Sequence, residues 1–540
     1  MDNTLEQSRQ LATALEELVD GACRALVARA QDPDGNVDQG AAEQEQGLLF
    51  DLATLSAAVT AGREMIDRMG DGDLALTHLA RVASDASARL LGRGVPLEPL
   101  DAVRDLVTAG RDMGLLSRVA DRVVATGEAG PRALADDIEM VRQSFRGFAE
   151  AKVMPMAERI HREDLDVPEE IISGLAELGT FALSVPEEYG GLIDESHAAL
   201  YSMLVATEEL SRASLGAAGS LSTRPEIVAW VIAKAGTEEQ KARWLPEIAS
   251  GAKMTSIAIT EPGTGSNVAA IRVTARPDGD GYIVDGVKTW CTFGGRAELL
   301  TILARTDPSP TAGHRGLSLV MIEKPAMPGH HFELTQEGGG RIEGRAIPTL
   351  GYRGMHSFEI SFEGWRIPAD AIIGGEEALG RGFYLQMEAF ANARVQTSAR
   401  AQGIIQAAID ESVAYTSARE IFGQPLSEFP LTKEKIALMA ATLTAARALM
   451  LQTADRIAEG HPEAGMSAAQ SKLFAGGSAE WITREALQLH GGYGYAEEYA
   501  ISRLFVDARV LSIFEGANEV LALKIIGRTL LNRAAQSLAA

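Results

Sequence analysis

The segment from Thr260 to Asn267, TEPGTGSN, combines two glycines with three hydroxyl-bearing residues. Such a loop offers backbone N–H groups and hydroxyl donors to an anionic or carbonyl-rich ligand, and no bulky side chain obstructs the approach. Trp290 precedes Thr292 by two positions, so on a regular strand both face the same side, where a planar ligand would stack on Trp290 and hydrogen-bond to Thr292. Each pattern also has a structural explanation, because Gly/Ser loops turn the chain and a half-buried tryptophan packs.

Three further segments place charged or polar groups beside glycine. Arg419 in REIFGQPL and Gln488 in QLHGGYGY belong to turns that end helices, where an arginine pairs with phosphate and glycines allow close approach of a ligand. The alternative for both is a helix C-cap with a surface side chain. Glu515 in IFEGANE is a carboxylate that follows apolar residues at the junction of a loop and a helix. The alternative for Glu515 is an acid that stabilises the start of that helix.

The elements that must position these residues are a group of helices, then a sheet, then a second group of helices. Apolar residues spaced by three and four indicate helices up to about residue 251, with breaks at 32–35 and 92–94. β-Branched, alternating runs between Lys253 and Pro368 indicate a β domain, and long helical patterns return from Gly380 onward.

The composition narrows the functional classes. A chain of 540 residues predicts roughly three to four domains. A net charge of −24 argues against nucleic acid or an anionic membrane as the main partner. Two cysteines, Cys23 and Cys291, are too few for a disulfide framework or a thiolate metal site, and no metal is predicted. We find neither a signal-peptide pattern nor an uncharged apolar run long enough for a bilayer, which predicts a cytoplasmic protein without membrane insertion.

Five motifs together resemble one family. TEPGTGSN, KTWCTFGG, AREIFGQPL, QLHGGYGY and IFEGAN stand in the order and spacing of the acyl-CoA dehydrogenase flavoenzymes, and the resemblance runs from about Pro131 to Arg533. It implies an α+β fold with an N-terminal helical domain, a middle β domain and a C-terminal four-helix bundle, here with an extra N-terminal helical extension. We therefore expect the extension at 1–130, the N-terminal α domain at 131–252, the β domain at 253–370 and the bundle at 371–540.

The resemblance also implies FAD as the cofactor, bound at a subunit interface of a homo-oligomer, either a dimer or a tetramer. Thr260, Gly265 and Ser266 look like contacts to the flavin and its ribityl chain. Trp290 resembles the aromatic residue that packs on the flavin face, and Thr292 the hydrogen-bond partner of flavin N5. The groups that resemble those holding the ADP half of FAD from a neighbouring subunit are Arg419, Phe422, Gln488, Gly491 and Gly492.

In this family a carboxylate removes the α-proton of an acyl-CoA thioester while the β-hydride passes to flavin N5, which gives a trans-enoyl-CoA. The base requires a dry pocket that raises its pKa. Glu515 matches the catalytic base. Some relatives carry the base on the helix that corresponds to Glu388–Val395, but residues 391–394 are Ala-Asn-Ala-Arg and offer no acid. By the same resemblance, an electron-transferring flavoprotein accepts the electrons.

The N-terminal extension and the glycine-rich Gly338–Gly344 most closely resemble family members of the ethylmalonyl-CoA pathway that oxidise (2S)-methylsuccinyl-CoA to mesaconyl-CoA. That substrate carries a free carboxylate, and its burial demands a cationic or multi-donor partner. Arg224 lies where relatives line the acyl cavity and is the candidate partner, with Arg394 as the alternative and Ser266 as a further substrate contact. Arg224 is otherwise a surface helix residue before Pro225.

Other functions stay open at this point. A dehydrogenase for another short or branched acyl-CoA would keep the flavin motifs, and an acyl-CoA oxidase would need a solvent-open flavin. A DNA-associated flavoprotein of the same fold would need a basic surface stripe, which the negative charge disfavours. The N-terminal extension is either a module that docks a redox partner or a structural part of the protein.

Overall fold

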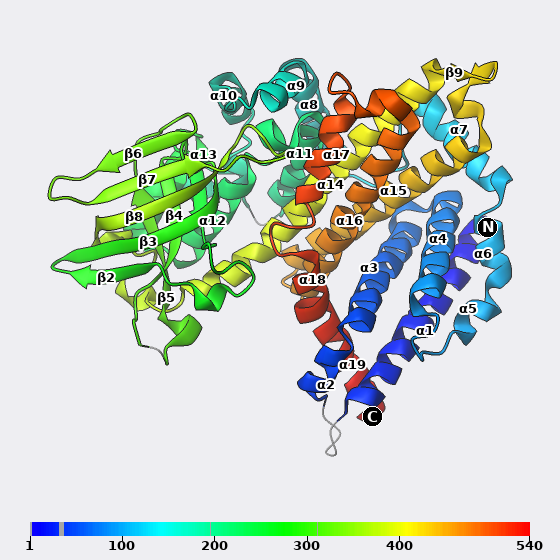
Figure 1. Ribbon diagram of the computed structural model, residues 1–540, viewed down its shortest axis with the longest axis horizontal. Helices are drawn as coiled ribbons and strands as arrows, with labels where there is room; N and C mark the ends of the chain where they lie inside the picture. Colours follow the sequence, from blue (N-terminus) through cyan, green and yellow to red (C-terminus); the bar gives the residue numbers. More distant parts are fainter. Residues whose placement is uncertain (1–2, 32–36, 195, 310, 540) are drawn as a thin grey trace. The chain divides into compact units, whose positions relative to one another are not determined.

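The computed structural model describes residues 3–31, 37–194, 196–309 and 311–539. The chain forms two compact units (Figure 1). The terminal unit combines residues 1–135 with 397–540, and the central unit consists of residues 136–396. The sequence break expected at 32–35 lies outside the described residues, and the four-part division at 130, 252 and 370 stays a prediction.

The central unit opens with helices that pack around two apolar cores. Phe145 and Met203 belong to the core of the earlier helices, Trp244 belongs to the core of the last two, and all three are buried. The last helix of the group starts with a capping box, in which Thr237 and Gln240 each satisfy a backbone N–H of the first turn. The helices are α8 Asp136–Phe148, α9 Met154–Glu163, α10 Glu169–Glu177, α11 Ala198–Ala213, α12 Thr223–Ala235 and α13 Glu238–Ala249, with π-helical segments η1 Ala149–Val153 and η4 Leu215–Gly219.

An eight-stranded sheet follows and confirms the expected β domain. The strand order is β1-β4-β2-β3-β8-β7-β6, and β5 pairs with β4. Alternate residues such as Ile360 and Phe362 are buried in the core of the sheet, which is the pattern that the β-branched runs predict. The strands are β1 Thr255–Ala258, β2 Thr274–Asp278, β3 Gly281–Thr292, β4 Leu299–Arg305, β5 Leu317–Glu323, β6 His331–Thr335, β7 Arg341–Ala346 and β8 Ser357–Pro368.

The terminal unit is helical and joins the two ends of the chain. Helix α14 (Gly382–Ala418) enters it, and a two-stranded turn of β9 (Glu420–Ile421) and β10 (Gln424–Pro425) follows. The C-terminal helices are α15 Pro430–Ala458, α16 Ala464–His490, α17 Ala500–Val510, α18 Asn518–Val520 and α19 Gly527–Ala539, with π-helical η11 Leu521–Ile526. The N-terminal helices are α1 Asn3–Ala30, α2 Gln39–Gln44, α3 Gln46–Met69, α4 Gly72–Leu90, α5 Glu98–Ala102, α6 Arg104–Gly110 and α7 Met113–Thr126.

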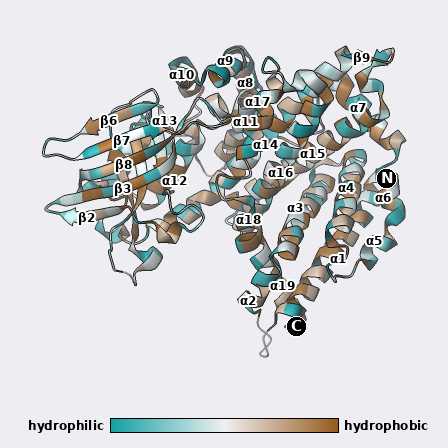
Figure 2. Ribbon diagram, in the orientation of Figure 1, coloured by the Kyte–Doolittle hydropathy of each residue, from teal (hydrophilic) through white to brown (hydrophobic). Residues whose placement is uncertain are grey.

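The N-terminal helices pack directly on the C-terminal ones. Helices α3, α4 and α7 contact α15, and α3 also contacts α16. Figure 2 shows hydrophobic residues along much of α1, α3 and α4. Helix α15 is the one described helix that is long and apolar enough to cross a membrane, yet 94% of its most apolar window is buried in the fold. Such burial is typical of the core helix of a soluble protein.

Candidate active site

A buried ion pair anchors the TEPGTGSN loop, which follows β1. Lys288 of β3 is fully buried, and its Nζ lies 3.0 Å from Glu261 Oε1 and 2.9 Å from the carbonyl oxygen of Ile259. The Glu261 carboxylate also accepts the backbone N–H groups of Arg272 (2.7 Å) and Val273 (2.8 Å). Burial lowers the pKa of Lys288 to about 8, against the opposing effect of Glu261. The loop therefore has a rigid base.

The predicted ligand contacts of this loop lie at its surface. Gly265 and Ser266 are exposed, Thr260 is half-buried, and a Cβ atom added to Gly265 would meet no atom within 4 Å. The backbone N–H of Thr289 donates to the carbonyl oxygen of Thr260 at 2.9 Å. This bond places the loop beside the end of β3, so the structure brings together two motifs that are separated in sequence.

The end of β3 departs from a regular strand at Trp290. Its φ is +59°, the side chain is 54% exposed, and the register against β8 shifts between Lys288 and Cys291. Thr292 is 5% exposed, and its Oγ1 lies 2.9 Å from Ser357 Oγ. The strand that carries Trp290 and Thr292 is therefore not regular, because a bulge interrupts the alternation from which a shared side was expected. The exposed indole is available to a planar ligand.

Backbone hydrogen bonds hold the residue after this bulge. Phe293 has φ +67°, and its N–H donates to the carbonyl oxygens of both Met355 (2.9 Å) and His356 (2.8 Å). A non-glycine residue in this region costs about 1–3 kcal/mol and persists where the surroundings determine it. The segment just before β8 thus fixes the position of Thr292 through Phe293 and Ser357.

Arg224 lies at the start of α12 and is 8% exposed, so its interpretation as a surface residue is wrong. Its Nη1 donates to the hydroxyl of Tyr352 at 3.3 Å. The nearby η4 segment packs tightly on the same loop, since a Cβ atom added to Gly216 would lie 2.2 Å from the carbonyl oxygen of Arg353. Arg394 is half-buried on α14.

The terminal unit contains a cavity of about 570 Å³ at the ends of α14 and α16. Three of the predicted residues line it: Arg419, Gly491 and Gly492. Its wall also contains Tyr415 and His490, which no sequence pattern singled out and whose rings stack with their centroids 4.3 Å apart. Burial lowers the pKa of His490, so its ring is neutral at pH 7.

Two predicted residues of the terminal unit lie outside the lining of that cavity. Phe422 is 96% exposed at φ +48° in the β9–β10 turn, and Gln488 is exposed on α16. An almost fully exposed phenylalanine in a strained conformation leaves apolar surface in water, which is typical of a contact to a ligand or another chain.

Glu515 lies in a strained turn between α17 and α18. Its φ is +54°, its side chain is half-buried, and α18 begins only at Asn518. Glu515 is therefore not in the first turn of a helix. The fully buried Lys472 of α16 donates from Nζ to the carbonyl oxygen of Gly516 (2.7 Å) and to Asn518 Oδ1 (3.0 Å).

A second buried cation supports the same turn. The guanidinium of Arg400 lies 4.5 Å from the ring centroid of Phe514, in a cation–π contact. No sequence pattern singled out Arg400 or Lys472, because in the sequence each is an ordinary basic residue on a helix. The turn that carries Glu515 is thus held by cations on two helices of the terminal unit.

Comparisons with known proteins agree on the family. Models of the N-terminal, middle and C-terminal domains of acyl-CoA dehydrogenases match residues 135–252, 256–365 and 380–531. A (2S)-methylsuccinyl-CoA dehydrogenase from Cereibacter sphaeroides is 38% identical over 96% of this chain and 96% of its own.

Solved structures show the same relationship. Butyryl-CoA dehydrogenase from Megasphaera elsdenii is 29% identical, with a TM-score of 0.67 over 74% of this chain and 99% of that one. A glutaryl-CoA dehydrogenase from Mycobacterium smegmatis in complex with FADH2 is 27% identical, with a TM-score of 0.64 over 74% and 96%. The chain belongs to the acyl-CoA dehydrogenase family.

Proposed function

We propose that this protein oxidises (2S)-methylsuccinyl-CoA to mesaconyl-CoA, as a member of the ethylmalonyl-CoA pathway. The similarity to the Cereibacter sphaeroides enzyme carries the proposal, because that alignment spans 96% of the chain. It therefore takes in most of the N-terminal extension, which lies outside the matched family domains at 135–531.

FAD is the cofactor, and the residues present fit it. The exposed Trp290 suits the flavin face. The open loop around Gly265 and Ser266 suits the flavin and its ribityl chain, together with Thr260. For flavin N5 we propose Thr292, on the family resemblance. When Ser357 donates to the Thr292 hydroxyl, Thr292 keeps its own proton for that contact. Bound FAD supplies the acceptor for the β-hydride. For the ADP half, we propose Arg419, Phe422, Gln488, Gly491 and Gly492, acting from a neighbouring subunit.

Glu515 is the proposed base for the α-proton of the thioester. That proton is a very weak acid, so the base must be placed close to the α-carbon and the developing enolate must be stabilised. The buried cations Lys472 and Arg400 hold the turn of Glu515 and thereby position its carboxylate. The backbone N–H of Glu515 is the proposed donor to the thioester oxygen.

Arg224 is the proposed partner of the substrate carboxylate. Its burial beside Tyr352 supports this role, because a buried guanidinium offers several donors in a fixed geometry to an incoming carboxylate. Arg394 is the alternative partner, and Ser266 is a further proposed substrate contact. An uncharged acyl chain cannot accept hydrogen bonds from this guanidinium, which disfavours substrates without the carboxylate.

The assembly and the cellular context complete the proposal. We propose a homo-oligomer, an electron-transferring flavoprotein as the electron acceptor, and a cytoplasmic location. Both cysteines are free and buried, and burial raises the pKa of Cys23 and Cys291 to about 12, which fits a protein that needs no disulfides.

The test is anaerobic reduction of the bound flavin, followed by loss of its visible absorbance. The panel is methylsuccinyl-, succinyl-, butyryl- and isobutyryl-CoA. We expect rapid reduction by methylsuccinyl-CoA alone, and its loss in Glu515→Gln with the flavin still bound. Rapid reduction by the uncharged acyl-CoAs would contradict the carboxylate specificity, and purified protein without flavin would contradict the whole proposal.

Two matched variants identify the cation. We expect Arg224→Met to slow reduction by methylsuccinyl-CoA about 100-fold, since losing one partner of a buried charge pair costs about 2–5 kcal/mol. Reduction by butyryl-CoA should change far less. If Arg394→Met shows this pattern and Arg224→Met does not, the assignment moves to Arg394.

A further inference from the structure

Four titratable side chains meet in the central unit, and none belongs to the proposed flavin or substrate contacts. Asp164 and Asp166 follow α9, His330 precedes β6, and His356 precedes β8. His356 is 6% exposed, with Nδ1 3.0 Å from Asp166 Oδ1 and Nε2 3.2 Å from Asp164 Oδ1. The rings of His330 and His356 lie 4.2 Å apart.

Three of these side chains present ligand atoms at the spacing of a metal site. One atom each of Asp164, His330 and His356 lies within 4.8 Å of the other two. Two ligands that are each about 2.0 Å from a tetrahedral zinc ion are about 3.3 Å apart. The 3.2 Å between His356 Nε2 and Asp164 Oδ1 matches that value. His330 is exposed.

Asp166 is placed to act as an outer-sphere carboxylate, which orients a metal-binding histidine through a hydrogen bond. Its Oδ1 accepts a hydrogen bond from His356 Nδ1–H, and its Oδ2 accepts one from the backbone N–H of Gly329 at 2.7 Å, next to His330. Asp166 thus holds the ring so that Nε2 faces the carboxylate of Asp164 at 3.2 Å, which is where an ion would be bound. Within the described parts of the chain, the ring nitrogens of His330 have no hydrogen-bond partner.

One neighbour opposes cation binding. Arg353 Nε lies 3.5 Å from Asp164 Oδ1, although Nε and Nη1 donate to the carbonyl oxygens of Thr349 (3.2 Å) and His161 (2.9 Å). This positive charge weakens the site relative to one with carboxylates alone. Three protein ligands with an exposed histidine also leave a coordination position to water.

We propose that Asp164, His330 and His356 bind a divalent transition metal, with zinc best matched to the nitrogen and oxygen ligands, and that Asp166 orients His356 from the outer sphere. The ion joins the segment after α9 to the segment before β8. The latter also receives the N–H of Phe293 and so fixes Thr292. The role of the metal is therefore structural, and it does not depend on the proposed substrate.

The test uses the full-length, flavin-loaded protein without a histidine tag, dialysed against a chelator and then titrated with zinc chloride. We expect about one equivalent of zinc, measured by calorimetry and elemental analysis, with a higher midpoint of thermal unfolding. His330→Ala should weaken binding at least about tenfold. His331→Ala is the matched control, because this exposed neighbour pairs with Glu343 instead.

Asp166→Asn provides a second variant that keeps the shape of the side chain, and it should weaken zinc binding about 10- to 100-fold. Wild-type protein that binds less than about a tenth of an equivalent would overturn the proposal and identify the cation between Asp164 and His356 as a proton. Equal zinc affinities of the His330→Ala and His331→Ala variants would also overturn the proposal. Loss of acyl-CoA oxidation with intact zinc binding would concern only the proposed function.

Discussion

Buried lysines support two of the turns that carry proposed site residues. Lys288 supports the loop that follows β1, and Lys472 supports the turn of Glu515. A buried ammonium group is costly unless its donors are satisfied, and each lysine directs its donors to oxygens of the turn that it supports. Their removal should therefore affect the site before it affects the fold.

Lys472→Met should lower the rate of flavin reduction about 10- to 100-fold, because a displacement of about 1 Å at a reacting group costs that much. The flavin content and the dissociation constant for acyl-CoA should change little. Stopped-flow reduction measures the rate and the substrate dependence separately. The control is Lys524→Met, an exposed lysine of the same C-terminal region that pairs with Glu43. An unchanged rate in Lys472→Met would show that the turn holds Glu515 without this lysine.

Flavin affinity should fall above about pH 8, where the Lys288 ammonium with its pKa of about 8 becomes neutral. The bond to Glu261 then loses its charge assistance, so the flavin dissociation constant should rise about three- to tenfold. Cys291 stays neutral in this range because burial raises its pKa to about 12. Equilibrium dialysis of FAD from pH 7 to 9.5 measures the effect, and Lys288→Arg should flatten the profile because arginine stays charged.

A loss of folding stability above pH 8 would not explain a fall in flavin affinity, because Lys288 has the opposite effect on stability. The pKa of Lys288 in the folded chain lies below its ordinary value of 10.5, so between about pH 8 and 10.5 the unfolded chain binds the additional proton. This group therefore increases the free energy of unfolding as the pH rises. Lys324 is the control, since its pKa is also lowered to about 8 but its Nζ donates to Gly295. If Lys324→Arg flattens the profile and Lys288→Arg does not, the assignment is wrong.

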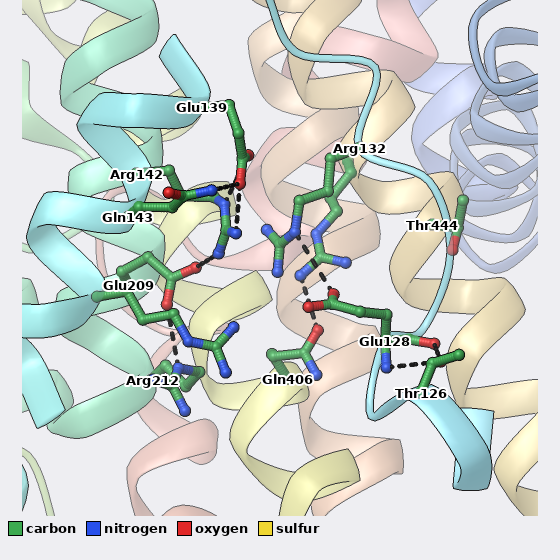
Figure 3. A network of polar contacts seen from close by, with 12 residues as sticks. Thr126, Glu128, Arg132, Glu139, Arg142, Gln143, Glu209, Arg212, Gln406 and Thr444 are labelled. Carbon is green, nitrogen blue, oxygen red and sulfur yellow. Dashed lines mark hydrogen bonds and ion pairs between the residues drawn. The ribbon is translucent and has the colours of Figure 1, made fainter. Parts of the chain in front are cut away.

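At the scale of elements, a buried charge network joins α8 to α11. Arg142 Nη1 lies 2.5 Å from Glu209 Oε1, and Arg212 Nε lies 3.1 Å from Glu209 Oε2 (Figure 3). Arg142 also binds Glu139 at 2.6 Å. Glu209 is 1% exposed, so its charge depends on these partners.

Arg142→Met should lower the free energy of unfolding by about 3 kcal/mol, because it leaves the Glu209 charge buried with one partner fewer. Urea denaturation followed by circular dichroism measures the change. Arg146→Met, one turn further along α8, removes an exposed pair with Glu150 and should cost less than about 1 kcal/mol. Similar losses in both variants would mean that the buried pair contributes no more than the exposed one.

Periodicity predicted the elements well and their irregularities poorly. The alternating runs located the sheet, and the helical spacing located α15 and α16, because burial repeats with the period of each element. The bulge at Trp290 was missed, since strict alternation assumes an unbroken register. The π-helical segment η4 was missed because one extra residue in a turn barely alters the pattern.

Site residues could be proposed from the sequence only where a local pattern marks them. Glycine and hydroxyl clusters pointed to the loop around Gly265, and the apolar approach pointed to Glu515, and both assignments stay predictions. The supporting Lys472 lies 44 residues from Gly516, and no local pattern connects them. The cluster of Asp164, His330 and His356 was missed for the same reason, since its members come from three separate segments.

At the scale of the whole molecule, the N-terminal extension belongs to the same compact unit as residues 397–540. Gln470 of α16 donates to Ser56 of α3 at 3.1 Å, and Arg81 of α4 lies 3.6 Å from the ring centroid of Trp481. These contacts, together with the packing of α3, α4 and α7 on α15, favour a structural role for the extension over a loosely attached docking module.

A chain that begins at Pro131 should therefore be insoluble or unfold at a much lower temperature, because it exposes the apolar faces of α15 and α16 that α3 and α4 cover. Expression tests and thermal unfolding measure this. Residues 1–130, co-expressed as a separate chain, should restore solubility and flavin content, since the contacts are noncovalent. Soluble truncated protein that keeps its flavin and its acyl-CoA oxidation would contradict the structural role. Slower reduction of the electron acceptor by that truncated protein would then identify the extension as a docking module.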